Sequence, residues 1–305
     1  MKLALLRSRL KPWMLPIAMV TGIFCSPVID AVAFLAPALI FVMLLITFCK
    51  IDTRHFRITR MTWALLAVQV VGALAVYGAL LPVNRVLAQG AFICVFCPTA
   101  PAAPVITGML GGSVPRLVTY SLVSNVAVAL TAPLLFSMMG SDVSFMESAV
   151  TIAARVFPLI LGPLAEALLL RRTDPCVHGV LARNQGLSFY IWAVSLIIVV
   201  GRAVSFMMAE PRTAIPLMVG LGAVSMVCCA AQFTIGRRIG RHYGDRIAGA
   251  QALGQKNTVL AVWMAIAYLN PISSVAPAAY VAWHNIVNSM QIYRKMHADA
   301  KAARQ

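Results

Sequence analysis

The sequence predicts an all-α integral membrane protein of ten transmembrane helices, arranged as two inverted five-helix repeats. Three observations predict this fold. The 305 residues are 61% hydrophobic and 11% charged, whereas soluble proteins carry about 25% charged residues. Apolar stretches of about 20 residues recur along the chain and leave no room for a soluble domain. Basic residues gather in alternate loops, as they do in proteins that cross a membrane an even number of times.

Each predicted span is close to the length that a helix needs to cross the hydrocarbon layer. The first span follows basic residues, as in a signal peptide. Pro16 interrupts it and no small-residue cleavage pattern follows, so we expect it to remain as the first helix. The spans cover residues 13–28, 31–49, 61–81, 86–110, 117–139, 148–170, 187–208, 215–235, 247–269 and 275–293.

The alternation of charge predicts the orientation. Of the 25 lysines and arginines, 20 fall in the terminal segments and loops of one side, and only Arg85 and Arg212 fall on the other. Because positive residues stay in the cytoplasm, both termini are expected there, in the inner membrane of a bacterium. The net charge of +16 is therefore expected to meet anionic lipid headgroups, not nucleic acid.

The fourth span is predicted to be a broken helix. Residues 97–104 read Cys-Pro-Thr-Ala-Pro-Ala-Ala-Pro. A proline removes a backbone donor and clashes with the turn before it, so three of them cannot lie in one continuous helix. Unpaired backbone at membrane depth is tolerated only where it faces protein or water. A kink without functional meaning is the alternative.

The ninth span carries a second break at the equivalent place of its half. Its apolar run is interrupted by Gly-Gln-Lys-Asn-Thr at residues 254–258, and Asn270-Pro271 follows. An odd number of spans in each half places the two repeats in opposite orientations. Broken helices at matching positions of inverted repeats are the best sequence indication of a transporter's binding site.

Lys256 is the strongest single candidate for that site. A cation at the centre of a membrane helix costs about 2.5–3.5 kcal/mol and is rarely without function. The alternatives are a lysine that snorkels from a helix end and a lysine that burial keeps neutral, which could carry a proton. Other polar residues are gathered around it, although each alone is more often interhelical glue. The predicted substrate or ion site comprises Lys256, Gln255, Gln251, Asn257, Thr258, Asn125, Ser121, Thr99 and Thr107.

Other polar groups within the spans are given structural roles. His284 is expected to be a satisfied buried histidine, and Arg155 and Arg202 are expected to form an internal ion pair with Glu166. Cys94 and Cys97 form a CxxC pattern without a second pair, so metal or thiol chemistry is disfavoured. No catalytic motif or pair of intramembrane carboxylates occurs, and neither an enzyme nor a cofactor is expected.

Several segments in order resemble the bacterial branch of the bile acid:sodium symporter family, within the superfamily of bile acid, arsenite and auxin-type carriers. They are the Cys97-Pro98 break running into residues 105–108, the Ala-Pro-Leu-Leu segment 132–135, the Gln-and-Asn break of span nine, and Trp-His-Asn at 283–285. The resemblance implies a panel of residues 13–49 and 148–208 and a core of residues 61–139 and 215–293. It also implies that helices four and nine cross, and that small organic anions move by alternating access.

The sequence departs from this family at the sodium ligands. The family's glutamate of helix nine falls on Gln251 and its following glutamine on Gln255, while a serine-asparagine pair falls on Ala103 and Pro104. A carboxylate and two oxygen ligands are missing, and a lysine has been gained beside them. We therefore expect a sodium-independent carrier in which Lys256 replaces one bound sodium.

Three alternatives to this carrier stay open. The first is sodium-coupled symport, as in the family. The second is an efflux carrier of the arsenite type; such carriers share a cysteine in the broken fourth helix, where this chain has Cys97. The third is a membrane-embedded enzyme or sensor, which the motifs do not favour.

Overall fold

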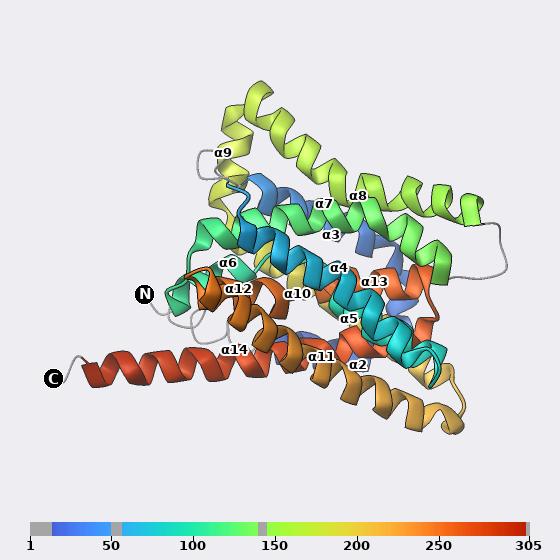
Figure 1. The fold of residues 1–305 in the computed structure, drawn as a ribbon. Coiled ribbons are helices and arrows are strands. Elements are labelled where there is room, and N and C mark those ends of the chain that lie inside the picture. The colour runs from blue at the N-terminus through green and yellow to red at the C-terminus, as the bar shows by residue number, and fades with distance from the viewer. Residues whose placement is uncertain (1–13, 50–56, 140–144, 303–305) are drawn as a thin grey trace.

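The computed structural model describes residues 14–49, 57–139 and 145–302, and these residues are mostly helical (Figure 1). Within these ranges no β-strand forms, and a single isolated antiparallel bridge joins Thr99 to Lys256. Several of the predicted cytoplasmic charges lie outside the described residues: Lys2, Arg7, Arg9, Lys11, Lys50, Arg54 and Arg304.

The helices follow the predicted segments closely, and several begin at side-chain caps. Asn84, Asp174, Asp245 and Asn257 each accept a hydrogen bond from a backbone N–H three residues later, which satisfies a free donor of the first turn. In order the helices are α2 (Met14–Cys25), α3 (Ala36–Cys49), α4 (Arg60–Leu80), α5 (Arg85–Phe96), α6 (Ala103–Leu110), α7 (Val114–Met139), α8 (Phe145–Thr173), α9 (Pro175–Arg183), α10 (Gln185–Ala209), α11 (Ile215–His242), α12 (Arg246–Gly254), α13 (Thr258–Tyr268) and α14 (Val275–Ala302).

Short 3₁₀ segments complete the described chain, at Ser26–Ala31, Ala33–Leu35, Arg212–Ala214 and Pro271–Ser274. Helix α9 lies between the sixth and seventh predicted spans, where no helix was predicted. Its cap at Asp174 and the proline that follows explain why it forms.

Four helical segments among the described residues are long and apolar enough to cross a membrane: 60–80, 114–139, 145–173 and 212–242. The bent pair 20–29 and 33–49 makes a fifth if it is one span. The prediction of an all-helical, multi-pass membrane protein is thus confirmed at this coarser level. The predicted fourth and ninth spans do not add to the number because each is divided into two short helices.

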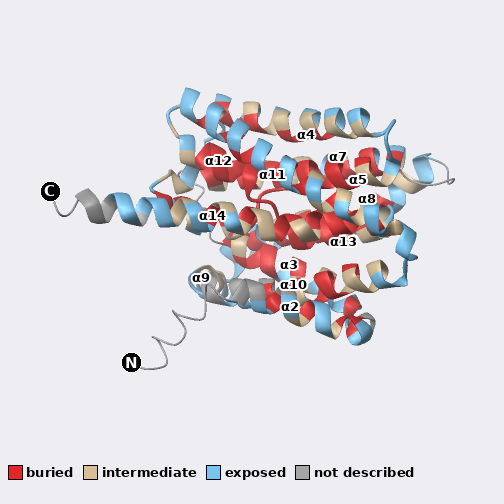
Figure 2. Cartoon of the chain, turned by 90° about the horizontal axis from the view of Figure 1, so that it is seen from below, coloured by how far each residue is buried: buried red, intermediate tan, exposed pale blue. Residues whose placement is uncertain are grey.

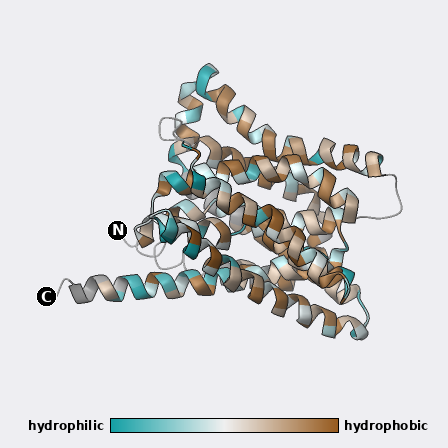
Figure 3. Ribbon diagram, in the orientation of Figure 1, coloured by the Kyte–Doolittle hydropathy of each residue, from teal (hydrophilic) through white to brown (hydrophobic). Residues whose placement is uncertain are grey.

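Helix α10 packs against α2 and α3, α3 packs against α8, and α8 packs against α7. Helix α11 packs against α5, α12 and α14. The most continuous burial runs along α5, α12 and α13 in the middle of the molecule (Figure 2). The long helices are mostly hydrophobic along their middles, and hydrophilic residues mark the protruding tail of α14 and the turn from α8 to α9 (Figure 3).

Helices α11 and α12 pack backbone against backbone at two glycines, Gly236 and Gly249. A Cβ atom added to Gly236 would lie 2.2 Å from the carbonyl oxygen of Gly249, and one added to Gly249 would lie 2.3 Å from that of Gly236. Small residues allow this approach between membrane helices. The start of α12 is also tied to the loop after α6, because Asp245 accepts a hydrogen bond from the backbone N–H of Ser113 at 2.9 Å.

Candidate functional site

The two breaks in the helices lie against each other. Residues 97–102 separate α5 from α6, and residues 255–257 separate α12 from α13. Thr99 of the first break pairs with Lys256 of the second in an antiparallel bridge. The breaks therefore lie where the proline-rich run and the polar run predicted them.

Backbone hydrogen bonds between the breaks satisfy groups that no helix pairs. The N–H of Ala100 donates to the carbonyl of Gln255 at 2.9 Å, and the N–H of Asn257 donates to the carbonyl of Pro98 at 2.8 Å. The Cys97 thiol also donates to the carbonyl of Asn257 at 3.2 Å. Buried backbone without such partners would be costly at membrane depth.

The two bridge partners cap each other's helices. Lys256 Nζ donates to the carbonyl of Val95 in the last turn of α5 at 2.8 Å. Thr99 Oγ1 donates to the carbonyl of Ala252 in the last turn of α12, also at 2.8 Å. Lys256 is 1% exposed, so it does not snorkel to solvent. A cation is stabilised at the negative end of a helix dipole.

Two glutamines complete the capping of α5. Gln232 Nε2 of α11 donates to the carbonyl of Cys94 at 3.1 Å, and Gln69 Nε2 of α4 donates to that of Phe96 at 2.7 Å. Together with the bond from Lys256 to Val95, three consecutive carbonyls at the end of α5 each accept a side-chain donor.

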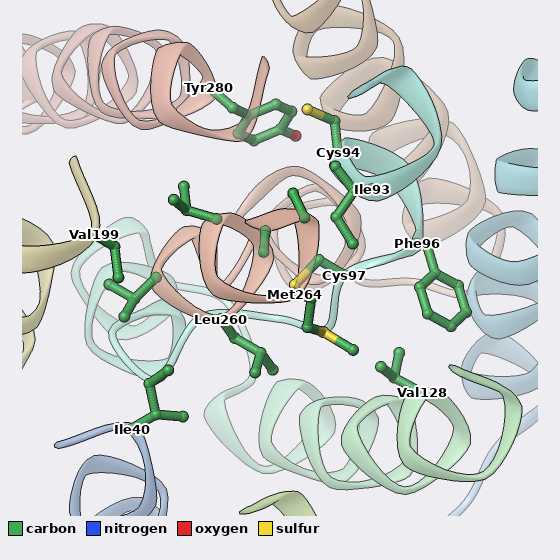
Figure 4. Packing of buried hydrophobic residues seen from close by; sticks show 14 of the residues in the cluster. Ile40, Ile93, Cys94, Phe96, Cys97, Val128, Val199, Leu260, Met264 and Tyr280 are labelled. Carbon is green, nitrogen blue, oxygen red and sulfur yellow. The ribbon is translucent and has the colours of Figure 1, made fainter. Parts of the chain in front are cut away.

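Each of these glutamines also pairs with a tyrosine. The Tyr120 hydroxyl donates to Gln69 Oε1 at 2.6 Å, and Gln232 Nε2 donates to the Tyr280 hydroxyl at 3.0 Å. Tyr280 in turn donates to the carbonyl of Gly254, and its ring points toward Cys94 in Figure 4. Sequence reasoning missed Gln69 and Gln232. The sequence feature that could have identified them is an amide side chain inside the third predicted span of each half.

The remaining predicted site residues are buried, and most have a polar atom without a hydrogen-bond partner. A buried group of this kind calls for a ligand or an ordered water. Asn125 Nδ2 donates to the carbonyl of Ser121 at 2.8 Å, which leaves its oxygen unpaired. The unpaired atoms of the set are Thr107 Oγ1, Asn125 Oδ1, Gln251 Oε1, Gln255 Oε1, Asn257 Nδ2 and Thr258 Oγ1.

Gln251 faces helix α14. Its Nε2 donates to Asn288 Oδ1 at 3.2 Å and to Gln291 Oε1 at 3.3 Å. Because α12 ends at Gly254, Gln251 and Gln255 do not lie on one continuous helix. His284 is buried on the same side of α14, but its Nδ1 has no partner. The prediction that His284 is a satisfied structural histidine is therefore wrong at that nitrogen.

Comparison with curated proteins finds a distant similarity to a bacterial protein. The chain is 25% identical over 221 residues to a protein of Bacillus subtilis (strain 168) named as an uncharacterized sodium-dependent transporter, YocS. The match covers 70% of this chain and 65% of that protein. The chain is similar to a bacterial transporter. No family model matches the chain. This similarity and the membrane-length helices support a transporter embedded in the membrane.

Proposed function

We propose that this protein is a secondary carrier that moves a small organic anion, such as a carboxylate, across the bacterial inner membrane by alternating access. In this carrier no sodium ion binds at the C-terminal end of α5, because the Lys256 ammonium takes the place of one bound cation. The observation that carries the proposal is the hydrogen bond from Lys256 Nζ to the carbonyl of Val95.

The end of α5 is the kind of place where transporters hold cations. Carbonyls at the C-terminal ends of broken helices coordinate sodium in several carrier folds. A hard cation needs several free oxygen ligands. Here the carbonyls of residues 94–96 accept bonds from Gln232, Lys256 and Gln69. A resident ammonium supplies the positive charge at that place.

In this proposal the anion binds at the opposite helix ends, the N-termini of α6 and α13. Helices α6 and α13 both begin at the breaks, so their N-terminal N–H groups and positive dipole ends lie beside the junction. Asn257 and Thr258, at the start of α13, are buried and have unpaired side-chain atoms. A carboxylate between these helix starts would accept hydrogen bonds that the protein alone does not use.

Matching contacts from the two halves of the chain support two inverted repeats whose core helices move together as one rigid body. Thr99 and Lys256 cap each other's helices. Each half further contributes a glutamine–tyrosine pair from its third and fifth predicted spans. These bonds join α4, α5, α7, α11, α12 and α14. They favour movement of this core against a panel of α2, α3, α8 and α10.

Sodium-coupled symport is the second candidate, because the Bacillus relative is named as sodium-dependent. In that case sodium would bind elsewhere among the unpaired oxygens, for example at Asn125 and Gln255. Both candidates accept an organic anion, and they differ in the requirement for sodium.

Thermal unfolding of the purified protein separates the two candidates. A panel of organic anions is added in sodium buffer and in choline buffer, to wild type and to Lys256→Ala. A ligand that binds only the folded state stabilises it by about 2.7 kcal/mol at one hundred times its dissociation constant. We expect a carboxylate to stabilise wild type equally in both buffers and to lose this effect in Lys256→Ala.

Stabilisation that requires sodium, and persists in Lys256→Ala, would contradict the role given to Lys256. Transport measured in vesicles provides the matching check. Sodium-stimulated uptake by wild type that is unchanged in Lys256→Ala would favour the symporter.

A further inference from the structure

Helices α6 and α13 each follow a break, yet their side chains are covered to different extents. Val105 and Met109 are the third and seventh residues of α6, and Leu260 and Met264 hold the same places in α13. The side chains of Val105 and Met109 are 53% and 58% exposed, whereas those of Leu260 and Met264 are 0% exposed. One face of α6 therefore lacks a cover that the corresponding face of α13 has.

Helices of the proposed panel contribute to the cover of α13. Helix α13 packs against α3 and α10 as well as α5 and α14. In Figure 4, Leu260 lies on the side of α13 that faces Ile40 of α3, and Val199 of α10 lies beside the same helix. Among the described residues, α6 packs mainly against α7, α12 and α14, and α12 packs mainly against α4, α6, α7 and α11. The proposed panel thus packs against the half-helix beyond the second break, and not closely against the two half-helices at the other end.

The backbone that leads into α6 indicates that its exposed face meets water and not lipid. Pro101 and Ala102 lie in the first break, outside any helix, and both are partly exposed. Irregular backbone at membrane depth is tolerated only where protein buries it or where it lines a water-filled cavity. Protein does not fully bury these two residues, so the second condition applies. We define the exposed face of α6, which continues from them, as Val105, Gly108 and Met109.

Basic residues mark the end of the molecule at which this face lies. Helix α7 carries Arg116 in its first turn, shortly after α6 ends, and α12 begins with Arg246. Both arginines belong to the charges that predict the cytoplasmic side. The exposed face of α6 is therefore expected to lie on that side of the junction.

We propose that the exposed face of α6 lines a water-filled passage from the cytoplasm to the first break, through which the transported anion enters or leaves. The passage ends at the break, because Thr99 and Lys256 beyond it are each 1% exposed. The packing of α3 and α10 on α13 closes the opposite side. The structure is then the state of the carrier that faces the cytoplasm, and closing that side covers Val105 and Met109. The assignment of the anion to this passage rests on the proposed function.

Single cysteines test the passage in the full-length protein. Met109→Cys is made together with Cys176→Ser, and native membrane vesicles of both orientations are treated with a membrane-impermeant maleimide. A thiol reacts as its thiolate, which forms in water and not in lipid or a packed core. We expect Met109→Cys to react from the side at which wild-type Cys176 reacts, about tenfold faster or more than a cysteine that faces lipid or packed protein.

Two further variants supply these comparisons. Val71→Cys is the lipid control, because Val71 is 64% exposed in the middle of the continuous membrane-length helix α4. Met264→Cys is the matched position on α13, and Ala265→Cys, a smaller change at a residue with 0% exposure, repeats the comparison if Met264→Cys does not fold. Both classes should react slowly from either side.

Three results would overturn the passage. Met109→Cys that reacts as slowly as Val71→Cys places the exposed face of α6 against lipid. Ala265→Cys that reacts as fast as Met109→Cys shows that the α13 side is not closed. Reaction of Met109→Cys from the side opposite to Cys176 contradicts the cytoplasmic opening.

The passage and the proposed function fail in different ways, because labelling needs no cargo. A protein that carboxylates stabilise through Lys256, but whose Met109→Cys variant is unreactive, retains the proposed function and lacks this passage. A protein that no organic anion stabilises, but whose Met109→Cys variant reacts as expected, has the passage without the proposed cargo.

Discussion

At the scale of the residue, Gln69 and Gln232 both donate a hydrogen bond to a carbonyl at the end of α5, but only Gln69 has partners for both its amide nitrogen and its amide oxygen. Gln69 Oε1 accepts from both Tyr120 and Ser124, and its Nε2 donates to the carbonyl of Phe96. Gln232 Oε1 has no partner, although its Nε2 donates twice. Hydrogen bonds between membrane helices contribute about 0.6 kcal/mol each on average.

We therefore expect Gln69→Leu to lower the free energy of unfolding by about 2 kcal/mol, roughly twice the effect of Gln232→Leu. Gln69→Leu removes more bonds and leaves two hydroxyls unpaired. Unfolding of both variants in the same detergent, side by side with wild type, measures the difference. A larger loss of unfolding free energy in Gln232→Leu would show that the number of hydrogen bonds does not determine how much each glutamine stabilises the protein.

For Lys256 the sequence alone could predict a functional residue but not its hydrogen-bond partner. A lysine within an apolar span could be recognised as functional from its cost. Its partner could not, because the Val95 carbonyl lies 161 residues earlier in the chain and every residue offers a carbonyl. The amides Gln69 and Gln232 were missed for the same reason: their importance depends on which helix end they meet.

At the scale of the element, the contact of α11 with α12 depends on glycine. We expect Gly236→Ala to destabilise the protein by more than about 2 kcal/mol, since its Cβ would overlap the backbone of Gly249 and force the helices apart. Gly222→Ala on the same helix is the control. No heavy atom lies within 4 Å of its added Cβ, so it should be neutral or up to about 1 kcal/mol stabilising. Unfolding temperatures and the yield of monodisperse protein test both, and equal effects would contradict this packing.

The positions of the helices were largely predictable, and their lengths less so. Proline chemistry predicts the break after α5, and a polar run predicts the break after α12. Helices α11 and α14 continue past the predicted spans to His242 and Ala302, because arginine and lysine are good helix formers and basic residues are favourable near a helix C-terminus. Hydropathy marks the end of the apolar layer, which is not the end of the hydrogen-bonded helix.

At the scale of the whole molecule, Cys176 offers a test of the predicted orientation. It lies on α9 and is the one exposed cysteine among the described residues, where Cys25 is partly buried and the others are buried. A membrane-impermeant maleimide should label wild type in inside-out vesicles and leave right-side-out vesicles unlabelled. Cys176→Ser should remove most of the signal. Labelling from the outside would reverse the orientation derived from the basic loops.

The tethered ammonium has an energetic consequence for the direction of transport. A bound sodium ion would cross with its cargo and be released, but the Lys256 ammonium remains attached to the protein. Under the proposed function, an anion then crosses with its charge uncompensated. With the cell interior negative by about 100 mV, one elementary charge is worth about 2.3 kcal/mol, roughly a fortyfold bias in concentration. The membrane potential would therefore favour export of the anion, and accumulation inside the cell would require exchange against a second anion.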